Sequence, residues 1–184
     1  MKYRDFKSEL KRHVPEGESI VWTGQPKQGI IFRTADVFLI PFSLLWLGFA
    51  IFWMYMAGQT SPMFALFGVP FVLFGLFFAF GRFVVDSKYR ESSVYGLTEN
   101  RIIIKSGLRK KEIRNIDLHS SSNFVFTENN DGTGSIEIGP RNPLVHGVSG
   151  LNWMPGVKSN TQLEMISNVQ SVYNMILELK NKKK

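Results

Sequence analysis

Basic side chains crowd around one short predicted turn, which makes this segment the part of the sequence best suited to bind an anion. The turn begins at Ser106-Gly107 and separates two predicted strands. Converging ammonium and guanidinium groups can hold a phosphate or an acidic protein surface, although lysines at a sheet edge also serve simply to prevent aggregation. The candidate binding residues are Lys105, Arg109, Lys110, Lys111 and Arg114.

A second candidate site is the segment 139–156, which is rich in Gly, Pro and Asn and carries several large apolar residues. Loops of more than about 12–15 residues are often functional. Exposed apolar side chains there, Trp153 above all, could enter a membrane interface or meet a partner. The alternative is that Trp153 folds back onto the domain.

Catalytic chemistry finds no support in the sequence. The three histidines, His13, His119 and His146, are far apart and lack metal-ligand spacing, and the chain contains no cysteine. The H-E-x-x-H, G-x-S-x-G and P-loop patterns are absent as well. We therefore expect a protein that is not an enzyme and that uses no cofactor and no metal.

The candidate residues follow a long uncharged run in the sequence. No charged side chain occurs between Asp36 and Arg82. A break at Gly58-Gln59-Thr60-Ser61-Pro62 divides the run into two apolar segments, each long enough to cross a hydrocarbon layer of about 30 Å as a helix. The sequence predicts a transmembrane helical hairpin over residues 36–86, with spans at about 37–57 and 63–84. Within it, Gly75 and Ala79 form one small-xxx-small pair, which suits either hairpin packing or association with another helix.

Charge predicts the orientation of this hairpin in a membrane. Lys and Arg concentrate on both flanks of the run, and the turn between the spans has none, so the positive-inside rule predicts that both termini lie in the cytoplasm. The net charge of +7 is spread along the chain. Attraction to an anionic leaflet explains it better than nucleic-acid binding, which we do not expect.

The flanking segments read as a small β domain. Residues 1–35 predict a short helix near 3–13, docked either on lipid or on the domain, and a strand at 19–23. Residues 87–184 predict an antiparallel meander that ends in an amphipathic helix with a capping box at Ser167 and Gln170. The predicted strands of this part are 92–97, 101–105, 113–118, 123–127, 135–138 and 162–166.

Several landmarks in this order resemble the bacterial pleckstrin-homology-like (PH-like) membrane protein family. They are Trp22-Thr23-Gly24-Gln25-Pro26, the apolar hairpin, Tyr95-Gly96-Leu97-Thr98 followed by Arg101, Gly134 to Gly139, and the strand-to-helix ending near 165–176. The resemblance implies an α+β chain: a two-helix transmembrane hairpin plus a PH-like small β-barrel or sandwich, with two roughly orthogonal sheets closed by the C-terminal helix. It implies no ligand, because fold alone does not determine function.

The interpretation, which includes the resemblance, is a non-enzymatic, multi-pass protein of the bacterial inner membrane with both termini in the cytoplasm. Its cytoplasmic domain serves protein binding or scaffolding. Its expected partners are the bilayer and a protein of unknown identity, and self-association stays open. One alternative is recognition of anionic lipid by the basic hairpin. Another is an accessory subunit of a transporter or membrane enzyme complex, built around the apolar hairpin.

Overall fold

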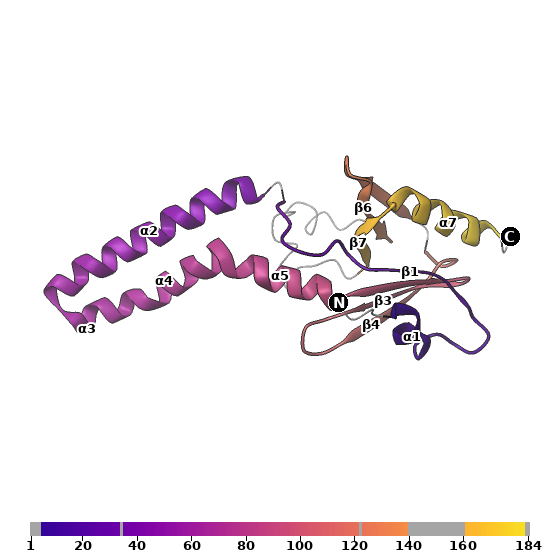
Figure 1. The fold of residues 1–184 in the computed structure, drawn as a ribbon, viewed down its shortest axis with the longest axis horizontal. Coiled ribbons are helices and arrows are strands. Elements are labelled where there is room, and N and C mark those ends of the chain that lie inside the picture. The colour runs from indigo at the N-terminus through magenta and orange to yellow at the C-terminus, as the bar shows by residue number, and fades with distance from the viewer. Residues whose placement is uncertain (1–4, 34, 122, 140–160, 183–184) are drawn as a thin grey trace. The chain divides into compact units, whose positions relative to one another are not determined.

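The computed structural model describes residues 5–33, 35–121, 123–139 and 161–182, and it shows an α+β chain (Figure 1). Its contacts divide the chain into two compact units. Among the described residues, one unit consists of Ile30–Ser87, and the other combines the residues up to Gly29 with those from Lys88 onward. The prediction of two long apolar helices together with antiparallel sheets is confirmed.

The Ile30–Ser87 unit is a helical hairpin. Its first arm is α2 (Asp36–Thr60), and its second is an almost continuous helical stretch, Pro62–Glu91, which continues past the end of the unit. Both arms are long and apolar enough to cross a membrane. In each arm, only 17% of the most apolar 18-residue segment is buried. The second stretch consists of α3 (Pro62–Ala65), the 3-10 turn η1 (Leu66–Gly68), α4 (Val69–Leu76), the π-helical turn η2 (Phe77–Gly81) and α5 (Arg82–Glu91).

The turn between the arms is tighter than the five-residue break that the sequence predicted. Helix α2 continues through Gly58 to Thr60, and Ser61 alone adopts an extended conformation, with φ −156° and ψ 122°. A residue that precedes proline is pushed out of the helical region, whereas Pro62 itself is well accommodated at the first position of a helix. The prediction was wrong because glycine and polar residues were read as a loop, although they can continue a helix.

Small residues bring the two arms close together. Gly75 in α4 is buried, and a Cβ atom there would lie 3.0 Å from Cβ and 3.1 Å from Cα of Leu47 in α2. Ala79 is also buried, at 4% exposure. The small-xxx-small pair is therefore used for packing inside the hairpin.

Ion pairs join the ends of the two arms. The Asp36 carboxylate at the start of α2 lies 2.8 Å from the Arg82 guanidinium, and both side chains are almost fully buried. Arg33 and Asp86 form a second pair at 3.0 Å, and the Arg33 backbone N–H donates to the Asp36 carboxylate at 2.7 Å. The two residues that bound the uncharged run thus neutralise each other.

The other unit is built on two antiparallel sheets. The first has the order β1-β2-β3-β4 and the second β5-β6-β7. The hairpin is inserted between β1 and β2, which pair directly with each other. The strands are β1 (Ile20–Gly24), β2 (Val94–Thr98), β3 (Arg101–Ser106), β4 (Glu112–Asp117), β5 (Phe124–Glu128), β6 (Thr133–Ile138) and β7 (Gln162–Ser167).

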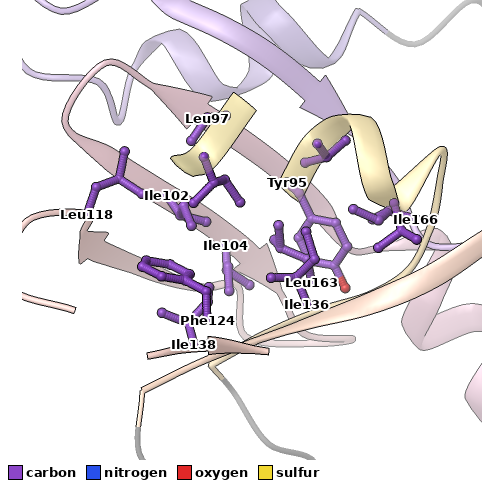
Figure 2. Packing of buried hydrophobic residues seen from close by; sticks show 13 residues of the cluster. Tyr95, Leu97, Ile102, Ile104, Leu118, Phe124, Ile136, Ile138, Leu163 and Ile166 are labelled. Carbon is purple, nitrogen blue, oxygen red and sulfur yellow. The ribbon is translucent and has the colours of Figure 1, made fainter. Parts of the chain in front are cut away.

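Both sheets and the C-terminal helix α7 (Val169–Asn181) contribute to one hydrophobic core (Figure 2). Tyr95 and Ile104 come from the first sheet, Ile136 and Leu163 from the second, and Ile176 from α7, and all are buried. In the described residues the two sheets do not join into a closed barrel.

The N-terminal helix follows one of the two alternatives that the sequence left open, and the C-terminal helix corrects a prediction. The N-terminal helix α1 (Phe6–Lys11) packs on the domain through Leu10, which is fully buried beside Val94 and Ile103. At the other end, the predicted capping box is wrong. Ser167 belongs to β7, and the residue before α7 is Asn168, which has φ 51° and makes no capping hydrogen bond with its side chain.

We predict that Gly75→Val destabilises the hairpin, because the new side chain must displace Leu47. Overpacking of this kind typically costs about 1–3 kcal/mol. The measurement is the free energy of unfolding in detergent. Gly48→Val is the matched control, since no heavy atom lies within 4 Å of a Cβ at Gly48. Equal losses in the two variants would contradict the packing role of Gly75.

We also predict that Asp36→Ala destabilises the hairpin by about 3–5 kcal/mol, because it leaves the Arg82 guanidinium buried without its carboxylate. The double variant Asp36→Ala with Arg82→Ala should lose less stability than the two single variants added together. Additive losses in this double-mutant cycle would show that the pair is not coupled.

Candidate functional site

The β3–β4 hairpin positions the candidate basic residues. Its ladder ends at the pair Ser106 and Glu112, so residues 107–111 form the turn. Gly107 has φ +117°, a backbone conformation that glycine adopts without strain, and a Cβ there would collide with the carbonyl oxygen of Lys110. Glycine is therefore required for the chain to fold this tightly before the basic residues.

Lys105 lies on the sheet face that α1 covers. Neighbouring residues along a strand point to opposite faces, and Lys105 shares its face with the buried Ile103. Its ammonium group forms an ion pair of 2.8 Å with Glu9 of α1, and both side chains are largely buried. Lys105 thus helps to attach α1 to the domain.

Arg114 points to the opposite face, because it pairs across the ladder with Ile104. Its guanidinium forms an ion pair with Glu112 on the same strand, with Nε 2.7 Å from a carboxylate oxygen. The five residues therefore do not form one patch, since Lys105 and Arg114 lie on different faces and each has an acidic partner.

The remaining three, Arg109, Lys110 and Lys111, are exposed at the tip of the hairpin. In the part of the chain that the structure describes, none of them forms an ion pair with an acidic side chain. Leu108 stands next to them with 44% of its surface exposed. The turn thus presents three positive charges beside an exposed apolar side chain.

Sequence reasoning missed three residues of this arrangement. Glu9 and Glu112 neutralise two of the basic residues, and Leu108 adds an apolar group to the tip. The leucine was visible between Gly107 and Arg109, but only the pairing isolates it with three cations. Trp153, the remaining candidate, lies outside the described residues, as does His146.

The motifs that carry the family resemblance have structural roles here. Glu18 accepts a hydrogen bond of 2.7 Å from the Thr98 hydroxyl and a two-pronged contact from Arg101, with an Nη2 to oxygen distance of 2.8 Å. Gly24 lies under the ring of Trp22, where a larger residue would collide. These contacts stabilise β1 and the β2–β3 turn.

The hydrogen bonds at Glu18 also change its acidity. Burial alone would raise the pKa of this carboxyl, but the hydrogen bonds from Thr98 and Arg101 lower the pKa by more than burial raises it. The pKa therefore lies below its usual value.

Among the described residues, no group of three or more His, Asp or Glu side chains is suited to hold a metal ion.

Comparison with known proteins gives no relative for this chain. No family model, no curated protein and no solved structure matches it.

We predict that the Glu18 cluster makes the β domain more stable at neutral pH than in acid. The folded pKa lies below the unfolded value of about 4.3, so this contribution is present above that value and is lost as the pH falls through the folded pKa. Glu18→Gln should lower stability by about 1.5–3 kcal/mol at pH 7, a typical figure for hydrogen bonds to a charged group. The deficit should shrink below pH 4.

The test is to unfold the full chain in detergent at several pH values between 7 and 3 and to monitor the unfolding by circular dichroism. Glu16→Gln is the control, because Glu16 is exposed. A deficit of Glu18→Gln that stays constant over this pH range would contradict the assigned role.

Proposed function

We propose that this chain is a non-enzymatic integral protein of the bacterial inner membrane that holds a β domain in the cytoplasm for binding a protein partner. The observation that carries the proposal is the exposed apolar surface of the helical hairpin. Phe38, Leu45 and Phe52 are each more than half exposed, and most of the exposed large apolar side chains lie in the hairpin. Such a surface requires a lipid environment or a partner.

The distribution of charge supports the proposed orientation. Lys and Arg lie on both sides of the hairpin, and the connection near Ser61 has none, which favours cytoplasmic termini under the positive-inside rule. The β domain then faces the cytoplasm.

The order of the elements supports a PH-like fold for the domain. Four antiparallel strands are followed by three more and by a helix that packs on the shared core. This arrangement leaves edge strands available to a partner. In the described residues β4 and β5 are each paired on one side only, and their outward side chains include Ile113 at 37% and Val125 at 36% exposure. A partner can add a strand to such an edge.

An accessory subunit of a transporter or membrane enzyme is the second candidate function, because the exposed face of the hairpin can also contact other helices. Gly75 and Ala79 do not argue for it, since both are used inside the hairpin. The two candidates differ in which surface the partner needs.

We predict that full-length protein, purified from its host at native level in mild detergent, retains one protein in stoichiometric amount, as measured by mass spectrometry. Ile113→Lys with Val125→Lys should abolish recovery, because lysine at a sheet edge blocks strand addition. Leu45→Ala with Phe52→Ala should leave recovery unchanged. The reverse pattern would favour the accessory subunit, and recovery of no protein by any variant would refute the proposal.

A further inference from the structure

The tip of the β3–β4 hairpin combines two properties that act together at a lipid surface. Arg109, Lys110 and Lys111 are exposed without acidic partners among the described residues, whereas the flanking Lys105 and Arg114 are neutralised by Glu9 and Glu112. The positive charge of this hairpin is therefore concentrated in the turn rather than spread along the strands.

Leu108 gives the turn its second property. It is 44% exposed at the start of the turn, directly before the three cations. Basic side chains attract anionic headgroups, and an apolar side chain beside them can enter the boundary between headgroups and acyl chains. The long stems of Lys and Arg allow their charged ends to stay at the phosphates while the backbone lies close to the surface.

The chain connections keep the domain near the bilayer. β1 ends at Gly24 and α2 begins at Asp36, while β2 begins at Val94 directly after α5 ends at Glu91. The domain is thus attached to the hairpin by two short segments. Tethering makes contact with the membrane an intramolecular event with a high effective concentration, so a few cations suffice.

We infer that the Leu108–Lys111 turn contacts the anionic lipid surface of the membrane in which the chain is anchored. Leu108 enters the interfacial layer, and the three cations contact lipid phosphates. This inference rests on the proposed function, because it requires the two apolar helices to lie in a bilayer. It goes beyond that function by assigning a second membrane contact to the β domain.

The chain contains no cysteine, so a single introduced cysteine can carry an environment-sensitive fluorophore at a unique position. We choose Leu108→Cys for the turn, Asn130→Cys as the water-exposed control at another turn of the β domain, and Phe52→Cys as the reporter of the apolar hairpin. Each full-length variant is placed in nanodiscs of phosphatidylcholine, with or without phosphatidylglycerol.

The expected result is a blue-shifted emission at position 108 in the anionic nanodiscs only, with quenching by lipids that carry a quencher near the headgroup. The shift should disappear when Lys110→Glu and Lys111→Glu are added. It should also disappear in 1 M salt, where the screening length falls from about 10 Å at 0.1 M to about 3 Å. Position 130 should report water in every condition.

Two outcomes would overturn the inference while leaving the anchor intact, as shown by a lipid-buried probe at position 52. In the first, the probe at position 108 reports water in both lipid compositions. In the second, position 108 is equally buried in both compositions, so that the cations do not select the surface. A water-exposed probe at position 52 would instead refute the membrane anchor and, with it, the proposed function.

Discussion

The ion pair between Asp36 and Arg82 is the interaction on which the arrangement of the apolar hairpin depends. These residues are the first charges on either side of the uncharged run, and their side chains lie 2.8 Å apart with little exposed surface. A buried charge without a partner is strongly unfavourable. The pair therefore requires the ends of the two arms to come together, with Gly75 allowing α4 to approach α2 along their length.

Closing the hairpin also matters for the β domain. The hairpin is inserted between β1 and β2, which are adjacent in the first sheet although a long segment separates them in the sequence. The entropy cost of pairing two strands grows with the length of the loop that joins them. In the closed hairpin the ion pair holds the two ends of the insertion together, so β1 and β2 have a shorter effective loop to close.

The sequence predicted the elements well wherever a local pattern is sufficient. The uncharged run specified both long helices, and alternating apolar residues located the strands to within one or two positions. It failed where conformation depends on neighbours along the chain. Helix α2 continues through Gly58 instead of ending there, and the residue before α7 is Asn168 rather than Ser167. In both cases residues that favour turns or caps were assigned to a turn or a cap. In the structure the helix instead continues at Gly58, and the strand β7 continues at Ser167.

The candidate site was harder to predict because a charge becomes available for binding only when no other element neutralises it. Counting basic residues treats Lys105 and Lys110 alike, yet Glu9 lies against one of them and the other stands exposed in the turn. The acid that pairs with Lys105 comes from a helix far away in the sequence, so no local pattern could reveal it. The same folding that removes two cations leaves the remaining three next to Leu108. The positive surface of this hairpin is therefore a property of the tertiary structure, and its composition alone overstates the size of that surface.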